Sequence, residues 1–364
     1  MISGTLRPSP LDLSADQERA LREISLWWKN WGRFKQCFVV VGYAGTGKTE
    51  LISRIAQSPG VVVAAMWGKA ASVLRARGVD AKTIHGLIYI PWRDKRGNLS
   101  YRKRDSLPDV ELIIIDEASV VDHVTFQDLL SFGLPILAVG DDGQLESIGT
   151  SGGFMPKPDI RLEQIHRQAE GNPILRLATA FRKNRAVPYW TDPNGKLRIA
   201  PRTEFWKLID PAIQIVCGLN KTRHAVNSKV REALGAFGQL PQKGEKLICL
   251  KNNSRYAIFN GQQFICAGVG LMGGKWVELD LETEERQIIS VPCALEQFGA
   301  DPVKDHRDRK IAFFDYGYAL TAHPAQGSEW PAVLVLEEIV KAWDRARWRY
   351  TAATRARERL VYCR

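Results

Sequence analysis

The feature that most constrains the fold is a glycine-rich loop between a predicted buried strand and a predicted helix. The residues Gly42–Thr49 read GYAGTGKT and directly follow the apolar run Cys37–Val41. In this G-x-x-x-x-G-K-[ST] pattern, glycines turn backbone N–H groups toward a phosphate, the lysine reaches the β and γ oxygens, and the hydroxyl ligates Mg²⁺. The residues expected to hold the triphosphate and its Mg²⁺ are Gly45, Thr46, Gly47, Lys48 and Thr49. The loop predicts a P-loop α/β fold.

A second apolar run, Leu112–Ile115, ends in an adjacent pair of carboxylates, Asp116 and Glu117. A carboxylate at the carboxyl end of a buried parallel strand can hold Mg²⁺ through its water shell, and a second one beside it can polarise an attacking water. We assign these roles to Asp116 and Glu117 respectively. An acidic helix N-terminus is the other interpretation of such a pair, but the strand, the spacing and the loop together favour the metal and water roles.

Composition and charge limit the classes of protein that fit this chain. With 364 residues, of which 45% are hydrophobic, it can form more than one domain. The net charge of +11 favours a polyanionic partner, either nucleic acid or an anionic membrane surface. No apolar stretch approaches the roughly 20 residues of a membrane span, and the first residues show no basic segment followed by a secretory apolar core. We therefore expect a cytoplasmic protein without a membrane partner.

The six cysteines are scattered without the C-x-x-C spacing of a zinc or iron–sulfur site. Reduced and mostly buried thiols are therefore expected.

The order of strand and helix patterns predicts two lobes. A capped helix begins after Ser14, with Gln17 as its N3 residue. Four apolar runs that alternate with helical patterns form a parallel lobe in residues 1–168. They are Phe38–Val41, Val61–Ala65, Leu112–Ile115 and Ile136–Val139. A second lobe covers 169–364, and its predicted elements are strands at Ile213–Cys217, Lys246–Leu250, Val333–Leu336 and Leu360–Tyr362 and a helix at Trp343–Ala356.

Two insertions interrupt the lobes. Residues 88–108 contain the basic segment Trp92–Arg104 with a turn signal at its middle, which predicts a β-hairpin. Residues 261–312 change to short alternating strands, which predicts a small β-barrel-like module. The basic run Arg102–Arg104 is also compatible with an ordinary solvated face.

The order of motifs resembles that of the superfamily 1 helicases, in the 5′-to-3′ branch that contains RecD-type and phage Dda-type enzymes. The resemblance runs nearly end to end, and it implies a protein of bacterial or phage origin. The matching segments are Ser14–Ala20 (Q motif), Gly42–Thr49 (motif I), Ile115–Asp122 (motif II), Gly140–Leu145 (motif III), His166–Gln168 (motif IV), Tyr318–Trp330 (motif V) and Thr354–Arg357 (motif VI).

This resemblance implies two RecA-like lobes with ATP in the cleft, and an SH3-like module at 261–312. It makes Gln144 a sensor of the γ-phosphate and Arg167 and Arg355 arginine fingers, which stabilise transition-state charge. The implied catalytic residues are Lys48, Glu117, Gln144, Arg167 and Arg355. Further implied ATP contacts are Gln17, His166, Gly327 and Glu329, although Gln17 already has a capping role and His166 is equally compatible with a structural role.

The same resemblance implies contacts to single-stranded DNA from both lobes, where hydroxyls, amides and stacked aromatics make binding tolerant of sequence. The positions are Trp67, Lys69, Thr83, His85, Thr321, His323 and Ser328. The basic hairpin that follows His85 adds Trp92, Arg93 and Arg96 as expected DNA contacts. Trp67 departs from the family pattern, in which a threonine often precedes Gly-Lys-Ala-Ala. It either stacks on a base or fills the core.

The predicted function is an ATP-dependent DNA helicase, monomeric, that translocates 5′ to 3′ on single strands and acts at single-strand/duplex junctions. The alternative within the same machinery is a translocase or motor subunit of a repair or recombination complex without robust unwinding. An interpretation of another class, a P-loop kinase or switch, is disfavoured by motif III and the second arginine. Replication or repair proteins are the expected protein partners.

Overall fold

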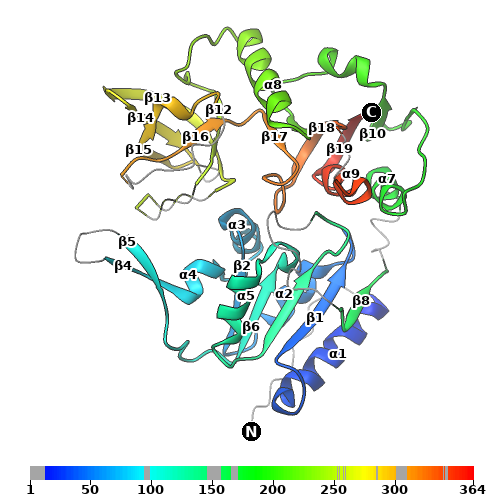
Figure 1. Ribbon diagram of the computed structural model, residues 1–364. Helices are drawn as coiled ribbons and strands as arrows, with labels where there is room; N and C mark the ends of the chain where they lie inside the picture. Colours follow the sequence, from blue (N-terminus) through cyan, green and yellow to red (C-terminus); the bar gives the residue numbers. More distant parts are fainter. Residues whose placement is uncertain are drawn as a thin grey trace. The chain divides into compact units, whose positions relative to one another are not determined.

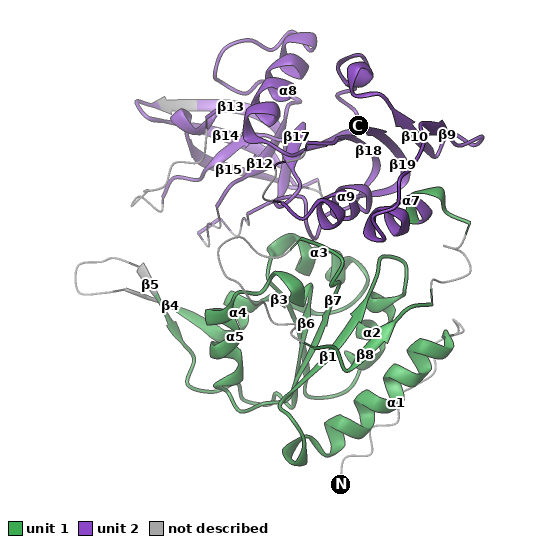
Figure 2. Cartoon of the chain, turned by 45° about the vertical axis from the view of Figure 1, so that its right-hand side comes forward, with its two compact units in different colours: residues 1–175 green, residues 176–364 purple. Residues whose placement is uncertain are grey.

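The computed structural model describes residues 13–93, 99–145, 157–164, 171–338, 340 and 343–364, apart from 252, 254, 257, 259, 284–285 and 301–309. The chain forms two compact units, Met1–Leu175 and Arg176–Arg364, shown in two colours in Figure 2. We call them lobe 1 and lobe 2 and describe each by itself.

Lobe 1 is built on a six-stranded sheet with the order β3-β2-β6-β7-β1-β8, and its neighbouring strands are all parallel (Figure 1). Its strands are β1 (Cys37–Gly42), β2 (Val61–Ala65), β3 (Ala81–Thr83), β6 (Leu112–Asp116), β7 (Ile136–Gly140) and β8 (Ile160–Leu162). Its helices are α1 (Ala15–Lys29), α2 (Lys48–Ile55), α3 (Gly68–Ala76), α4 (Ile84–Ile88) and α5 (His123–Leu130); α7 (Pro173–Arg182) crosses into lobe 2. The four strands predicted for this lobe are confirmed.

The central strands are apolar on both faces because each face is covered. One core cluster packs α1, α2 and α3 against one side of the sheet, and a second cluster packs α4 and α5 against the other. This explains why β6 reads as an unbroken apolar run rather than an alternating one. The predicted first helix is also confirmed, because Ser14 and Gln17 form a complete capping box at the start of α1.

The predicted hairpin insertion is present in lobe 1. Strands β4 (Tyr89–Arg93) and β5 (Leu99–Lys103) pair antiparallel, with Tyr89 opposite Lys103 and Arg93 opposite Leu99. The base of the hairpin is fixed to α5, because the Tyr89 hydroxyl donates to the Asp128 carboxylate.

Lobe 2 contains a second six-stranded sheet, ordered β17-β11-β18-β19-β10-β9, which is parallel except for the edge strand β9. Its strands are β9 (Trp190–Thr191), β10 (Leu197–Ala200), β11 (Gln214–Cys217), β17 (Ala319–Thr321), β18 (Trp330–Leu336) and β19 (Ala356–Cys363). Its helices are α8 (Asn220–Ala233) and α9 (Arg345–Ala353). The predicted last helix is therefore shorter than expected, and β19 begins directly after Arg355.

The inserted module is a five-stranded antiparallel sheet with the order β15-β14-β13-β12-β16. Its strands are β12 (Lys246–Cys249), β13 (Gln263–Gly273), β14 (Trp276–Glu282), β15 (Ile288–Ala294) and β16 (Phe314–Tyr316). One prediction needs correction here: the run at Lys246–Leu250 belongs to this module, not to the parallel sheet. Short apolar runs of parallel and antiparallel strands look alike in sequence, and only the pairing partners separate them.

All six cysteines are free, and five of them are buried. Among the described residues, none of the helices combines the length and apolar character needed to cross a bilayer.

Candidate active site

The phosphate-binding loop joins β1 to α2 in the predicted strand–loop–helix order. Gly47 caps the helix with a φ of 78°, in the left-handed region that glycine tolerates best. A Cβ at Gly42 would lie 2.5 Å from Thr46 Oγ1, so the tight turn requires glycine there. The Thr46 hydroxyl in turn donates to the Tyr43 carbonyl at 2.8 Å, which closes the loop on itself. The backbone geometry therefore matches an anion cradle at a helix N-terminus.

The side chain of Lys48 lies over this loop. Its ammonium donates to the carbonyls of Gly42 at 2.6 Å and Tyr43 at 3.1 Å, and it stands 3.9 Å from Asp141 Oδ2. The side chain of Lys48 is only 14% exposed. A lysine held this close to the loop is already positioned to meet phosphate oxygens, because its stem needs little rearrangement to move from the carbonyls to an anion.

The two carboxylates at the end of β6 occupy distinct environments. Burial raises the pKa of Asp116, while the Glu117 backbone N–H and the charges of Lys48 and Arg77 partly oppose that shift. A cation near Asp116 would stabilise its charged form further. Glu117 adopts a left-handed conformation with φ 52° and ψ 41°, which is costly for a residue with a side chain. Such strain concentrates at functional sites, which is consistent with the predicted role of Glu117.

Motif III follows β7, the strand between β6 and β1. Asp141 is fully buried and accepts from the Gly143 backbone at 2.9 Å and from Gln144 Nε2 at 3.3 Å. Gln144 is 5% exposed, and within the described residues its Oε1 atom has no hydrogen-bond partner. A buried acceptor without a partner is costly, so this oxygen is suited to a ligand donor or a water.

Sequence reasoning missed two supporting residues. Asp141 lies within motif III, where only Gln144 has a predicted role, yet its carboxylate stands between Lys48 and Gln144. Arg161, on β8, forms a 2.6 Å ion pair with Asp142 and a 2.9 Å hydrogen bond to the Tyr43 hydroxyl. It thereby ties the phosphate loop to motif III. Only the spatial adjacency of β1 and β8 reveals this contact, since the residues are far apart in sequence.

Gln17 has the capping role predicted for it and one further contact. Its Oε1 accepts from the Ser14 backbone at 2.9 Å, and its Nε2 donates to the Gly47 carbonyl at 3.1 Å. The first helix is thus fixed to the phosphate loop. The role of Gln17 as reader of the adenine stays a prediction.

Within lobe 2, Arg355 is 3% exposed. Its guanidinium donates to the carbonyls of Thr351 at 2.9 Å and Ser328 at 3.0 Å and to the Thr354 hydroxyl at 2.9 Å. Arg355 therefore fastens the turn of motif V to the end of α9. Its role as an arginine finger stays a prediction that requires some of these bonds to be exchanged for phosphate oxygens. In the same turn, Gly327 has a φ of 70° and Glu329 is exposed.

The predicted DNA contacts fall into different environments. Thr83 caps α4 by accepting from the Gly86 backbone at 3.0 Å, and the His85 ring lies 5.2 Å from that of Tyr89. Trp67 is half-buried at the start of α3, which leaves both of its interpretations open. In lobe 1, Lys69 is buried. In lobe 2, Ser328 is buried, whereas Thr321 and His323 are half-buried.

Several predicted residues cannot be placed. His166, Arg167 and Arg96 lie outside the described residues. For Trp92 and Arg93 the backbone pairing in β4 is described, and their contacts to DNA stay predictions.

Three comparisons with known proteins agree with this geometry. A family model described as an AAA domain matches residues 12–201, and a model described as a UvrD-like helicase C-terminal domain matches residues 316–362. An ATP-dependent RecD2 DNA helicase of Deinococcus radiodurans is 29% identical over 359 residues. That match covers 88% of this chain but only 46% of the relative, so the chain spans about half the length of this curated protein.

Solved structures of Pif1 helicases share the fold. One, described for DNA unwinding at forked duplex DNA by two coordinating Pif1 helicases, has a TM-score of 0.63 at 17% identity and covers 97% of this chain and 92% of its own. The Candida albicans Pif1 helicase has a TM-score of 0.58 at 17% identity, with 97% and 94% covered. At this level of identity the likeness establishes the fold.

A phosphate loop, a strand-end carboxylate pair and a buried glutamine on three adjacent strands define the class of P-loop nucleoside triphosphatases. Within that class the chain belongs to the AAA-domain family, whose model covers more than half of it. The predicted resemblance to the superfamily 1 helicases of the 5′-to-3′ branch is confirmed by the two family models, the RecD2 relative and the Pif1 fold taken together.

Proposed function

We propose that this chain is an ATP-dependent DNA helicase that translocates 5′ to 3′ on single-stranded DNA and separates duplex strands at a junction. The observation that carries the chemistry is the meeting of Lys48, Asp141 and Gln144 at the carboxyl ends of adjacent strands. Lys48 lies 3.9 Å from Asp141, and Asp141 accepts from Gln144 at 3.3 Å. The DNA substrate is supported by the RecD2 DNA helicase relative and by the Pif1-like fold. The polarity is supported by the resemblance of the motif order to the 5′-to-3′ branch.

In the proposed reaction, Lys48 neutralises charge on the transferred phosphoryl group and Glu117 polarises the attacking water. Thr49 and Asp116 provide oxygen ligands of the kind that Mg²⁺ prefers. The positive charge of Lys48 already favours the ionised form of Asp116. When bound there, Mg²⁺ would supply positive charge that offsets the charge of the phosphate groups. The Oε1 atom of Gln144, which has no hydrogen-bond partner among the described residues, would accept a hydrogen bond from the attacking water and so couple hydrolysis to motif III.

For DNA, we propose that the net charge of +11 serves phosphate contacts, with backbone-directed binding by both lobes. The partners would be single-stranded DNA and single-strand/duplex junctions. We further propose that the protein acts as a monomer in the cytoplasm, alongside replication or repair proteins.

The deciding experiment is strand displacement from substrates with either a 5′ or a 3′ single-stranded overhang, in the presence of ATP and Mg²⁺. Displacement from the 5′-overhang substrate alone supports the proposal. Displacement from the 3′ overhang alone contradicts the polarity. DNA-stimulated hydrolysis without displacement from either substrate would instead support a translocase or motor subunit. Hydrolysis unaffected by added DNA would exclude both.

A further inference from the structure

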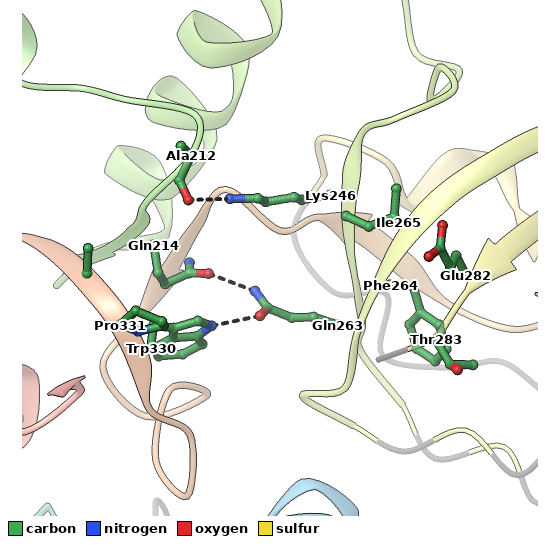
Figure 3. A pocket seen from close by; sticks show the side chains of 11 residues that line it. Ala212, Gln214, Lys246, Gln263, Phe264, Ile265, Glu282, Thr283, Trp330 and Pro331 are labelled. Atoms are coloured by element: carbon green, nitrogen blue, oxygen red, sulfur yellow. Dashed lines mark hydrogen bonds between the residues drawn. The ribbon is translucent and has the colours of Figure 1, made fainter. Parts of the chain in front are cut away.

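A groove of about 290 Å³ lies between the parallel sheet of lobe 2 and the inserted β module, and two sets of hydrogen bonds cross it (Figure 3). In the first, Lys246 Nζ of β12 donates to the carbonyls of Pro211 at 2.6 Å and Ala212 at 3.2 Å, just before β11. The second is a chain of three side chains. From the sheet side come Gln214 of β11 and Trp330 of β18; from the module side comes Gln263 of β13. Trp330 Nε1 donates to Gln263 Oε1 at 2.9 Å, and Gln263 Nε2 donates to Gln214 Oε1 at 2.7 Å. The module is therefore linked across the groove by side chains that point toward one another (Figure 3).

The direction of this chain is fixed by chemistry. An indole N–H can only donate, so Gln263 must turn its oxygen toward Trp330 and its nitrogen toward Gln214. Gln214 must then turn its own oxygen toward Gln263, and its Nε2 donates to the carbonyls of Tyr318 at 3.0 Å and Gly317 at 3.2 Å. Gln214 is 3% exposed, so these bonds are shielded from water. A chain with a single consistent orientation holds its ends more specifically than isolated pairs do.

The indole end of the chain reaches the motif that contains Arg355. The Trp330 backbone N–H donates to the Arg355 carbonyl at 2.9 Å, and the Arg355 guanidinium donates to the Ser328 carbonyl, two residues before Trp330. Any exchange of the Ser328 bond for a phosphate oxygen would release the turn that directly precedes Trp330. The side chain of Trp330 would then carry that change to Gln263.

The module is also held to lobe 2 by apolar packing and by an ion pair. It shares one continuous core with lobe 2, in which Leu247 and Phe264 of the module pack with Ile213 and Val226. Arg223 of α8 also pairs with the buried Asp315 of β16 at 3.0 Å. Because packed cores resist deformation, a change at Gln263 should tilt the module about this core rather than detach it.

We propose that Trp330 is a positioning residue that passes the nucleotide state of Arg355 to the inserted module through its hydrogen bond to Gln263. The inference rests on the proposed function, because it assumes that Arg355 responds to nucleotide. Trp330 touches no reacting atom in this scheme. It sets the tilt of the module, and thereby how much strand separation accompanies each ATP hydrolysed.

The first test measures tilt without DNA. Fluorescent labels at Ile288→Cys on β15 and Trp190→Cys on β9 would report energy transfer between the module and the far edge of the sheet, in a Cys37→Ala background because the other cysteines are buried. Both label positions are exposed. We expect a non-hydrolysable ATP analogue to change the transfer in the parent, and Trp330→Phe to abolish that change. Trp206→Phe, which alters an exposed tryptophan of the same lobe, is the matched control and should retain it.

A parent without a nucleotide-dependent change, or a Trp330→Phe variant that keeps it, would overturn the inference. If Trp330→Phe fails to fold, Gln263→Glu replaces it. The carboxylate can still accept from Trp330 but repels Gln214 Oε1, so the change should again be lost, and its retention would count against the link.

The second test measures coupling. The ratio of base pairs separated to ATP hydrolysed should fall about fivefold in Trp330→Phe, the effect of one hydrogen bond, with hydrolysis close to parental. A parental ratio in this variant would also contradict the inference. A parent that shows the nucleotide-dependent tilt but never unwinds would contradict the proposed helicase function and leave the link standing.

Discussion

The ammonium of Lys48 lies 3.9 Å from the carboxylate of Asp141, which joins the phosphate loop after β1 to motif III after β7. Asp141 has no exposed surface and also holds Gln144 through its side chain. The carboxylate of Asp141 therefore positions both Lys48 and Gln144. If Lys48 shifts when it binds phosphate, the carboxylate of Asp141 would transmit that shift to Gln144.

Removing either group assigned to hydrolysis should nearly abolish it. Lys48→Ala loses the charge that meets the phosphates, and Glu117→Gln loses the carboxylate that polarises water. Each should lower DNA-stimulated ATP hydrolysis by about 10² or more, measured as steady-state phosphate release. Glu117→Gln should keep nucleotide binding, since its role lies in the reaction rather than the ground state. Near-parental turnover in either variant would contradict the role assigned to that residue in hydrolysis.

Gln144→Ala should separate activity from stability. Hydrolysis should fall about tenfold while nucleotide affinity changes little, because the proposed contact forms mainly in the reacting state. The free energy of unfolding, measured in urea, should not decrease by the amount usual for a buried polar residue. The substitution removes an oxygen that lacks a hydrogen-bond partner among the described residues. The bond from Nε2 to Asp141 that it also removes is long, at 3.3 Å, and Asp141 keeps its bond from the Gly143 backbone. A large loss of stability with parental hydrolysis would make Gln144 a structural residue.

The positive charge predicts salt-sensitive binding. If the net charge of +11 serves phosphate contacts, the affinity for single-stranded DNA should fall steeply with salt. A log–log plot of the association constant against salt concentration should have a slope of about −0.7 for each neutralised phosphate, over several phosphates. Fluorescence anisotropy with labelled oligonucleotides measures it. A flat dependence would leave the charge unexplained and favour a partner other than nucleic acid.

His323 should contribute to that binding without charge. Burial lowers the pKa of His323 below its ordinary 6.5, so the imidazole is neutral at pH 7 and above. Its protonation is disfavoured in the folded state, which means that stability falls as the pH drops through the ordinary value of 6.5. His323→Gln should therefore leave the salt slope unchanged between pH 7 and 8. A shallower slope in this variant would indicate a charged histidine on the DNA backbone.

The sequence predicted the parallel lobe well because its signals are local and redundant. The run before Gly42 and the run before Asp116 are each bounded by residues whose chemistry requires the carboxyl end of a strand. The capping box of Ser14 and Gln17 is likewise complete within four residues. Such features need no knowledge of distant partners.

The contacts that join distant segments could not be predicted. Arg161 reaches Tyr43 only because β8 lies beside β1, and Gln263 reaches Trp330 only because the module folds back on the sheet. The run at Lys246 was placed in the wrong sheet for the same reason, since pairing is a long-range property.

The last prediction concerns strand separation by the hairpin β4–β5, which follows the segment Thr83–His85. Translocation needs only the two lobes, whereas separation needs an obstacle at the junction, and we expect the hairpin to provide it. Replacing Asp94–Arg102 by a short Gly-Ser turn should strongly reduce unwinding and leave DNA-stimulated hydrolysis and single-strand translocation largely intact. The replacement spares the base, where Tyr89 bonds Asp128 and the Arg104 backbone N–H donates to the Ile88 carbonyl at 2.8 Å.

The matched control is Arg102→Ala, which removes an exposed charge while keeping the hairpin. If the shape of the hairpin, rather than its charge, separates the duplex, Arg102→Ala should unwind at close to the parental rate. Only the variant with Asp94–Arg102 replaced should lose unwinding. If the hairpin merely covers the lobe, its deletion should lower unwinding and hydrolysis together through lost stability, and thermal melting would reveal that loss. A folded deletion variant that unwinds at the parental rate per ATP would place the obstacle elsewhere. The inserted module of lobe 2 would then be the next segment to shorten.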